Sequence, residues 1–433
     1  MKKSFIYISV CLGVVLYNGC NQGKTTTNQS DNTAFATTNS SNDINLAGAE
    51  GLQRIAVFSN CTNYDNKLST VASEVRFIPL DYEPPIDDLI RMADIELNDD
   101  YIWLIGLDYI YQYDRQGNFI RNVGNRGMGP ADYLQLRPPL QIDNTEKTIY
   151  TLDGPRKRVL VYNFDGTFNR AFPINFPTKI TLLDFETIVF PSEHWSLPNA
   201  LFLTFTDRDG QNGKNYYSHL HPVMQRSEAK TIPEANFFWE HAGRFYYLEY
   251  GADTIFQISR DTFVPVWVLT GELKLDKKEL FLLGNTGKKL VNASNLFRPN
   301  AGIFESNRFL IFKLSDDQDR FYMVYDKVSG QFHRTYDKNT PVIETELPRG
   351  GVRVRIDNDY FIDDLISGLH FTPQYQSMGK AIGLISAITV AENRDEILRH
   401  IASHPSEESE RLKPIVEKMD EFDNPLVMIV TFK

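Results

Sequence analysis

Residues 113–119 read Tyr-Asp-Arg-Gln-Gly-Asn-Phe, and this pattern recurs along the chain. Residues 162–168 read Tyr-Asn-Phe-Asp-Gly-Thr-Phe, and residues 325–332 read Tyr-Asp-Lys-Val-Ser-Gly-Gln-Phe, with one residue more in the turn. In each copy an aromatic residue ends a strand, Asp or Asn accepts turn hydrogen bonds, Gly takes a positive φ, and Phe begins the return strand. The motif therefore predicts repeated antiparallel hairpins.

Around the first copy, a complete unit of four short strands can be predicted. The apolar runs 89–96, 101–106, 109–114 and 119–123 are separated by turns rich in Asp, Asn and Gly, which predicts an antiparallel meander. Comparable groups recur at intervals typical of propeller repeats. The sequence predicts an all-β fold, a six-bladed β-propeller of four-stranded antiparallel blades, with strand groups beginning near Leu89, Pro139, Thr181, Asn236, Ala301 and Gly351.

Both ends of this repeating region are expected to contribute to its closure. The strand-like residues 74–80 and 426–432 are predicted to pair in one sheet, which would remove exposed edges. Before the last strand, residues 392–402 and 406–421 carry apolar side chains at helical spacing. They predict a short helical insertion near the C-terminus that packs on the propeller, with a partner-binding helix as the alternative.

Composition limits the class of protein. The chain has 433 residues, of which 42% are hydrophobic, so it can bury a large core. Asp and Glu number 56 against 45 Lys and Arg, which gives a net charge of −11 and argues against nucleic acid as a partner. Because Cys11, Cys20 and Cys61 all lie near the start, the rest of the chain has neither a disulfide framework nor a cysteine metal site.

The N-terminus has the features of an export signal. Lys2 and Lys3 precede an apolar run at 5–16, and Gly19-Cys20 follow it in a stretch that resembles the lipobox of bacterial lipoproteins. We expect a signal peptide at 1–19, lipidation of Cys20, a flexible tether at 20–67 rich in small polar residues, and the propeller at 68–433. An ordinary signal peptide cleaved elsewhere, or a buried core helix, is the alternative.

Four stretches together resemble the six-bladed β-propeller lipoproteins of Bacteroides-type bacteria, which look related to NHL-repeat propellers. They read Phe-Ile-Pro-Leu at 77–80, Gly-Asn-Arg-Gly-Met-Gly-Pro-Ala-Asp-Tyr at 124–133, Asp-Thr-Ile-Phe at 253–256 and Asp-Asn-Pro-Leu at 423–426. The resemblance covers residues 68–433. It implies a propeller lipoprotein of the periplasm or cell surface, and it brings no catalytic residues with it.

Loop 124–133 provides the candidate ligand-binding residues. Arg126, Asp132 and Tyr133 lie in a connection between blades, where they could line one mouth of the central channel. The structural alternative is that Arg126 and Asp132 fix the loop through an internal ion pair. The loop does not open a helix and lacks a Gly-Lys-Ser/Thr ending, so we expect no nucleotide cofactor.

Signals for metal or catalytic chemistry are few. His219 and His221 would point to the same face of a strand and are candidates for a shared ion, with a solvated strand end as the alternative. We expect no metal and no cofactor. Gly-x-Ser-x-Gly, His-Glu-x-x-His and Cys-x-x-Cys are all absent, so no catalytic residue is assigned and an enzyme is not the expected class.

Together these features predict a monomeric cell-envelope lipoprotein, anchored at Cys20 to the outer membrane on its periplasmic or surface side. Its propeller is expected to bind a small ligand or a partner, such as a carbohydrate, a peptide or an envelope protein. A carbohydrate-active hydrolase or lyase is the alternative and predicts a channel rich in carboxylates. A subunit of an outer-membrane assembly is a third possibility and predicts a large apolar patch.

Overall fold

The computed structural model describes residues 52–56, 62–86, 94–174, 179–191, 201–217, 236–249, 254–270, 302–315, 319–346 and 352–433. These belong to one unit, Gly48–Lys433. The predicted lipidation residue Cys20 and the predicted metal candidates His219 and His221 lie outside the described residues.

Within the described residues, five blades are meanders of four consecutive strands that pair in chain order. Blade 1 contains β4 (Asp94–Leu97), β5 (Tyr101–Ile105), β6 (Ile110–Asp114) and β7 (Phe119–Asn122). Blade 2 contains β8 (Leu136–Asp143), β9 (Thr148–Asp153), β10 (Arg158–Asn163) and β11 (Phe168–Pro173). Blade 3 contains β12 (Thr181–Leu182), β13 (Ile188–Pro191), β14 (Leu201–Thr206) and β15 (Lys214–Tyr217). Blade 4 contains β16 (Asn236–His241), β17 (Arg244–Glu249), β18 (Thr254–Ile258) and β19 (Phe263–Thr270). Blade 5 contains β20 (Ile303–Glu305), β21 (Phe309–Ser315), β22 (Asp319–Asp326) and β23 (Gln331–Thr335).

The repeated turn motif behaves as predicted. Gly117, Gly166 and Gly330 have φ values of 91°, 85° and 70°, a region that favours glycine. In the first copy, one carboxylate oxygen of Asp114 accepts hydrogen bonds from the backbone N–H groups of Gln116 and Asn118, both at 2.9 Å. The turn residues therefore set the geometry of the third hairpin of each of these blades.

A closing sheet joins the two ends of the propeller. Its strands lie in the order β28 (Tyr375–Ser377), β29 (Lys380–Ile385), β30 (Leu426–Phe432) and β3 (Ala72–Pro79). Strands β3 and β30 are antiparallel, in a register that runs from Pro79 opposite Leu426 to Ala72 opposite Phe432. The prediction that residues 74–80 pair with residues 426–432 is confirmed.

The prediction of six four-stranded blades is wrong. Only five blades repeat the consecutive meander within the described chain, and the strands expected as a sixth blade from near Gly351 join other sheets. Strand β25 (Val352–Asn358) pairs with β24 (Val342–Glu346) and, in parallel, with β22 of blade 5. Strands β26 (Phe361–Ile362) and β27 (His370–Phe371) form a separate pair. The short apolar runs identified strands but could not identify their partners.

Two strands near the start of the described chain widen blades 4 and 5. Strand β1 (Gln53–Ala56) adds in parallel to β19, and β2 (Thr62–Tyr64) adds in parallel to β23. The 3₁₀ turn η1 (Leu68–Thr70) then leads into β3. Residues 53–56 and 62–64, which fall within the stretch expected as a tether, are therefore part of the sheets.

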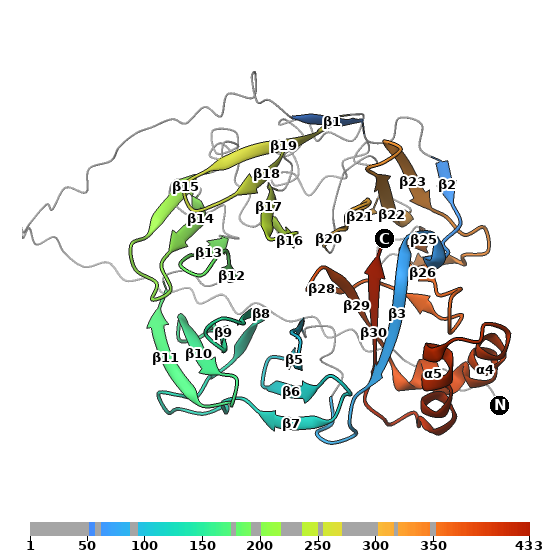
Figure 1. Ribbon diagram of the computed structural model, residues 1–433, viewed down its shortest axis with the longest axis horizontal. Coiled ribbons are helices and arrows are strands. Elements are labelled where there is room, and N and C mark those ends of the chain that lie inside the picture. The colour runs from blue at the N-terminus through green and yellow to red at the C-terminus, as the bar shows by residue number, and fades with distance from the viewer. Residues whose placement is uncertain are drawn as a thin grey trace, which may run out of the picture. The chain divides into compact units, whose positions relative to one another are not determined.

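Buried side chains fill the space between neighbouring sheets. Ile78 and Ile429 of the closing sheet, for example, pack with Ile95 and Leu104 of blade 1. The first strands β28, β4, β8 and β12 contact one another in turn, as do β16 and β20. These are the inner strands of their sheets, and the blades follow one another around them in chain order (Figure 1).

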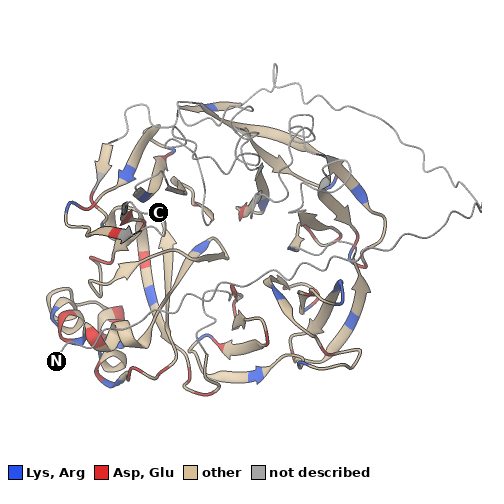
Figure 2. Ribbon diagram, turned by 180° about the vertical axis from the view of Figure 1, so that it is seen from behind, with Lys and Arg blue, Asp and Glu red and all other residues tan. Residues whose placement is uncertain are grey.

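Helices α3 (Ala387–Glu392), α4 (Arg394–Ser403) and α5 (Glu407–Lys418) lie between β29 and β30 and confirm the predicted insertion. Ser406 caps α5 by accepting a hydrogen bond from Ser409 N–H. Leu412 and Val416 are buried in the cluster that includes residues of β3 and β30. Acidic residues mark the insertion in Figure 2, and five of them lie in the first turns of α4 and α5. No described helix meets the length and apolarity needed to span a membrane.

Candidate functional site

The 124–133 loop connects β7 of blade 1 to β8 of blade 2 and holds the three predicted ligand-binding residues. Arg126 and Tyr133 form a parallel bridge across it. Gly127 N–H donates to the Tyr133 carbonyl at 3.0 Å, and Tyr133 N–H donates to the Asn125 carbonyl at 3.0 Å. The two ends of the loop are therefore held together by its own backbone.

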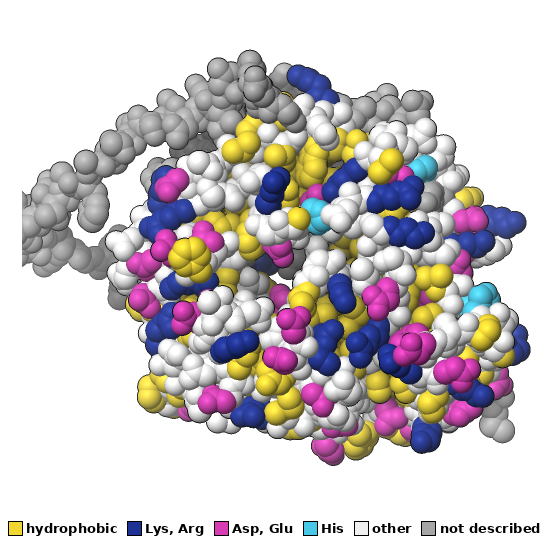
Figure 3. Space-filling model, viewed as in Figure 1, with side chains coloured by type: hydrophobic (Ala, Val, Ile, Leu, Met, Phe, Trp, Pro, Cys, Tyr) yellow, Lys and Arg dark blue, Asp and Glu magenta, His cyan; other side chains and the backbone are white. Residues whose placement is uncertain are grey.

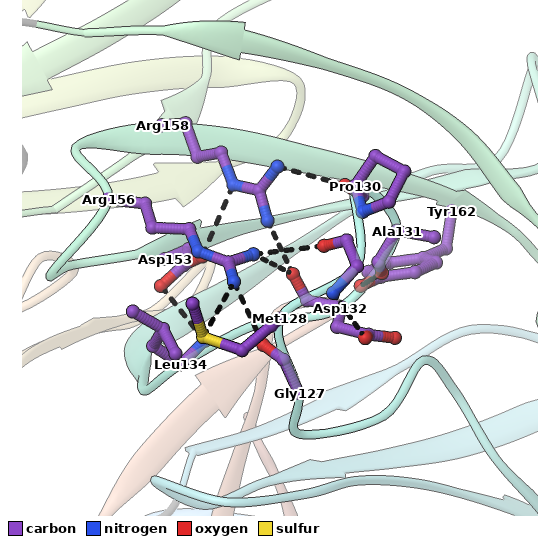
Figure 4. A network of polar contacts seen from close by, with 11 residues as sticks. Gly127, Met128, Pro130, Ala131, Asp132, Leu134, Asp153, Arg156, Arg158 and Tyr162 are labelled. Atoms are coloured by element: carbon purple, nitrogen blue, oxygen red, sulfur yellow. Dashed lines mark hydrogen bonds and ion pairs between the residues drawn. The ribbon is translucent and has the colours of Figure 1, made fainter.

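Two arginines from the turn and strand after β9 hold the middle of the loop (Figure 4). Because a guanidinium group donates several hydrogen bonds in fixed directions, it can bind several carbonyls at once. Arg156 donates to the carbonyls of Gly127 at 2.9 Å, Gly129 at 3.0 Å and Asp132 at 2.9 Å. Arg158 donates to the carbonyls of Pro130 at 2.8 Å and Asp132, and the Tyr162 hydroxyl donates to the Ala131 carbonyl at 2.7 Å.

One buried carboxylate orients both arginines. Asp153 Oδ2 lies 3.2 Å from Arg158 Nε and 3.8 Å from Arg156 Nε, and its side chain has no exposed surface. Its other oxygen accepts a hydrogen bond from Leu134 N–H at 3.2 Å. A buried charge requires such partners, so Asp153 and the two guanidinium groups form one unit that supports the loop (Figure 4).

The three predicted residues have different environments. Tyr133 is buried, its hydroxyl donates to the Asp108 carbonyl at 3.2 Å, and burial raises its pKa. Asp132 Oδ2 accepts from Gly129 N–H at 2.7 Å, so it caps the loop internally. Arg126 is 64% exposed, and its Nη1 lies 3.0 Å from Asp108 Oδ1 rather than from Asp132. The ion pair between Arg126 and Asp132, which was the structural alternative for this loop, is not formed, because Arg126 pairs with Asp108 instead.

Glycines allow the loop to fold tightly around Asp132. A Cβ atom at Gly127 would lie 2.5 Å from Asp132 Oδ2, and one at Gly129 would lie 2.8 Å from the same atom. Between them, the side chain of Met128 is 81% exposed. The loop therefore uses its backbone and acidic group for rigidity, and presents Met128 and Arg126 to solvent.

A second polar group, which sequence reasoning missed, lies on the inner strands. Asp94 and Glu96 alternate along β4 with the buried residues Ile95 and Leu97, so they share the opposite face. Leu140 N–H of β8 donates to Asp94 Oδ2 at 3.1 Å. The hydroxyl of Ser377, on β28, donates to Glu96 Oε2 at 2.6 Å. These two carboxylates link blade 1 to the sheets on either side.

Burial dominates the acidity of both carboxyls. It raises the pKa of Asp94 to about 6, against the lowering effect of the Leu140 N–H group and the charge of Lys179. It raises the pKa of Glu96 well above its ordinary value, and the nearby charges of Asp94 and Glu240 add to that rise. A carboxyl with a raised pKa can act as a general acid near neutral pH.

The described residues give little support for a bound metal ion at the 124–133 loop or at the inner-strand carboxylates. In the described part of the chain, no group of three or more His, Cys, Asp or Glu side chains is placed to hold a metal ion.

Residues 52–431 match the model of a family described as Domain of unknown function (DUF4934). No curated protein matches the chain in sequence. Among solved structures, the chain is similar to a "Putative exported protein" from Bacteroides fragilis, with 15% identity and a TM-score of 0.59 over 88% of this chain and 99% of that one. This likeness shows a shared fold.

Two further solved structures are similar over much of their length but at lower TM-scores. One is a member of the DUF4221 family from Bacteroides vulgatus, with 10% identity, a TM-score of 0.38, and coverage of 84% of this chain and 97% of that one. The other is virginiamycin B lyase from Staphylococcus aureus, with 12% identity, a TM-score of 0.37, and coverage of 66% and 92%.

Proposed function

The chain belongs to the DUF4934 family, and we propose that it is a cell-envelope lipoprotein whose propeller binds a partner through the 124–133 loop, with no catalytic residue assigned. The observation that carries this proposal is the support of that loop. Five of its carbonyls are bound by three side chains of blade 2, while Met128 and Arg126 point outward.

A rigid exposed loop suits binding for a physical reason. Ordering a mobile loop on binding costs conformational entropy, whereas a loop that is already ordered avoids that cost. Methionine adapts to irregular apolar surfaces, and arginine contributes charge and several donors, so both are frequent in protein interfaces. On the face seen in Figure 3, charged side chains of both signs are interspersed with apolar ones, which suits a protein or peptide partner better than a small molecule.

The proposed location rests on the N-terminal pattern. Lys2, Lys3, the apolar run and Gly19-Cys20 support export and lipidation of Cys20. The structurally similar Bacteroides fragilis protein carries the name "Putative exported protein", which agrees with this placement. We further propose that the anchor lies in the outer membrane and that the protein is a monomer. Replacing Cys20 with Ala should move the protein from the membrane to the soluble fraction, and an unchanged partition would contradict lipidation.

The binding proposal is tested with paired surface variants. Full-length protein is applied to arrays of peptides, envelope proteins and glycans, and the double variant Arg126→Ala with Met128→Ala is compared with it. The control is Arg411→Ala with Val328→Ala, whose side chains are 57% and 79% exposed elsewhere on the surface. We expect the loop variant to lose binding by about tenfold or more with an unchanged melting temperature, and the control to bind normally. Equal binding by both variants would contradict the proposal.

A polysaccharide hydrolase or lyase is the second candidate function, because Asp94 and Glu96 lie together on the inner strand β4 with raised pKa values. If this function holds, the protein degrades a polysaccharide and Glu96→Gln abolishes the activity without weakening polysaccharide binding. Degradation that persists in Glu96→Gln would exclude Glu96 as part of the active site. If the wild-type protein degrades a polysaccharide and the loop variant binds its partners as the wild type does, the enzyme function replaces the binding proposal.

A further inference from the structure

We propose that the outer edge of β24 docks an extended, basic segment of a partner protein, which pairs with it as an added strand. In the described residues β24 pairs with β25 alone, and β25 pairs in turn with β22, so β24 is the outermost strand of this part of the sheet. An edge strand presents a row of backbone N–H and C=O groups that can pair with another chain. This edge is separate from both the 124–133 loop and the inner-strand carboxylates.

The chain itself shows that extended segments add to the sheets of this region. Strand β1 adds in parallel to β19, and β2 adds in parallel to β23. Strand β25 adds in parallel to β22, in the same sheet as β2. Each of these additions is made through backbone hydrogen bonds between strands that are not neighbours in the sequence. The occupant that suits the edge of β24 is therefore one more extended segment.

Apolar side chains of β24 are exposed at this edge. Val342 is 55% exposed and Ile343 is 38% exposed. Successive residues of a strand point to opposite faces, so the two side chains present apolar surface on both faces of the sheet. Edge strands that stay unpaired are usually protected by charged side chains, Pro or bulges. A strand added beside β24 would cover both apolar side chains.

The start of β24 is held in place by the end of β25. Asn358, the last residue of β25, is buried, and its Oδ1 accepts hydrogen bonds from Asp337 N–H at 3.0 Å and the Thr340 hydroxyl at 2.7 Å. Its carbonyl accepts from the Thr335 hydroxyl at 2.7 Å. The chain therefore enters β24 from a fixed position, which lowers the entropy lost when a partner strand binds.

Charge indicates the chemistry of the partner. Residues 342–346 read Val-Ile-Glu-Thr-Glu, with two acids and no basic residue, and Glu344 is exposed. Opposite charges across a strand pair stabilise it, and like charges destabilise it. A second copy paired antiparallel about Glu344 would place that carboxylate opposite itself. A segment that alternates basic and apolar residues instead places Lys or Arg opposite Glu344 and an apolar side chain opposite Ile343, while the alkyl part of a second Lys can cover Val342.

The test is fluorescence anisotropy of labelled peptides titrated with the full chain. The probe is a seven-residue peptide in which Lys and Val alternate. One control peptide alternates Glu and Val, and the other is the Lys-Val peptide with all its backbone amides N-methylated, which cannot donate strand hydrogen bonds. We expect the Lys-Val peptide to bind, and each control peptide to bind about fivefold or more weakly than it does.

Matched charge reversals locate the binding edge. Glu344→Lys should weaken binding of the Lys-Val peptide by about fivefold or more and strengthen binding of the Glu-Val peptide, with an unchanged melting temperature. Glu421→Lys makes the same change of charge at an exposed residue in the turn before β30 and should bind as the wild type does. The loop variant Arg126→Ala with Met128→Ala should also bind the Lys-Val peptide normally, so this inference and the function proposed for the loop can fail separately.

Several results would overturn the proposal. Absence of binding by the wild type would do so, as would equal binding of the N-methylated peptide, which would indicate charge attraction without strand pairing. Equal effects of Glu344→Lys and Glu421→Lys would show that the peptide binds elsewhere. A wild-type dimer in analytical ultracentrifugation that becomes a monomer on Ile343→Arg would show that a second copy occupies the edge.

Discussion

Arg156 supports the 124–133 loop through several hydrogen bonds and an ion pair. It binds three loop carbonyls and lies beside the buried carboxylate of Asp153. Arg156→Ala should lower the free energy of unfolding by about 2 to 4 kcal/mol, because it leaves carbonyls unpaired and a buried charge with one partner fewer. Arg156→Lys should recover only part of this loss, since an ammonium group cannot reproduce the fork of donors.

Chemical denaturation measures this effect, with Arg411→Ala as the control. The Arg411 guanidinium is 57% exposed and pairs with Glu407 on the surface, so its removal should cost less than about 1 kcal/mol. Equal losses for Arg156→Ala and Arg411→Ala would mean that the loop network contributes little to stability.

Asp94 predicts a dependence of stability on pH. Its pKa in the folded protein is about 6, above the value of about 3.9 for an unfolded chain, so the folded state holds the proton more tightly. This contribution is complete below pH of about 4 and is lost as the pH rises through about 6, to a total of about 3 kcal/mol. Asp94→Asn removes the titration, so its unfolding free energy should fall less than that of the wild type over this range.

Urea denaturation at several pH values between about 4 and 8 checks this difference. Glu421→Gln, at an exposed position in the turn before β30, serves as the matched control and should follow the wild-type curve. Parallel curves for Asp94→Asn and the wild type would rule out Asp94 as the group responsible.

The candidate site shows which residues sequence reasoning can find. The place of the 124–133 loop between two blades could be predicted locally, so Arg126, Asp132 and Tyr133 could be placed in one connection. Arg156 and Arg158, which bind the carbonyls of the loop, come from the next blade, and no local sequence pattern predicts them.

At the scale of elements, Asn424 joins the turn before β30 to the segment after β3. Its Nδ2 donates to the carbonyls of Tyr82 at 3.2 Å and Pro84 at 2.9 Å, and its Oδ1 accepts from Ile86 N–H at 2.7 Å. Asn424→Asp replaces the donor by an oxygen that faces those carbonyls in a buried position. We expect a loss of about 2 to 4 kcal/mol in the free energy of unfolding.

Thermal or urea unfolding measures this change. Asn339→Asp is the control, because it makes the same chemical substitution at an exposed turn residue and should stay within about 0.5 kcal/mol of wild type. A similar small effect at Asn424 would show that the segment after β3 does not depend on this side chain.

Strand partners set the limit of what local patterns could predict. The hairpin turns were recognised because Gly and Asp act within a few residues of one another, and the pairing of β3 with β30 followed from the need to close the ring. Residues 352–358 form a strand as expected, but that strand pairs in parallel with β22 and not as the first member of another meander. Its pairing depends on surrounding sheets, which the periodicity of one segment does not report.

At the scale of the whole molecule, each blade and the closing sheet pack against two neighbouring sheets. A substitution that destabilises the closing sheet should therefore destabilise the other blades as well. Val427 is a buried residue of β30, paired with Leu384 of β29 on one side and Ile78 of β3 on the other. Proline there removes a ladder hydrogen bond from a central strand and should cost at least about 3 kcal/mol. Val427→Ala, which keeps the backbone bonds, should cost less.

Tryptophan fluorescence can follow this effect far from the substitution, because Trp103 is buried between blades 1 and 2 and Trp239 between blades 4 and 5. With each tryptophan studied separately by replacing the others with Phe, both signals should report one transition, and Val427→Pro should lower both midpoints together. A midpoint that falls for Trp103 and stays unchanged for Trp239 would mean that the blades unfold independently. Coincident shifts would show that the pairing of β3 with β30 stabilises blade 4, although neither strand belongs to that blade.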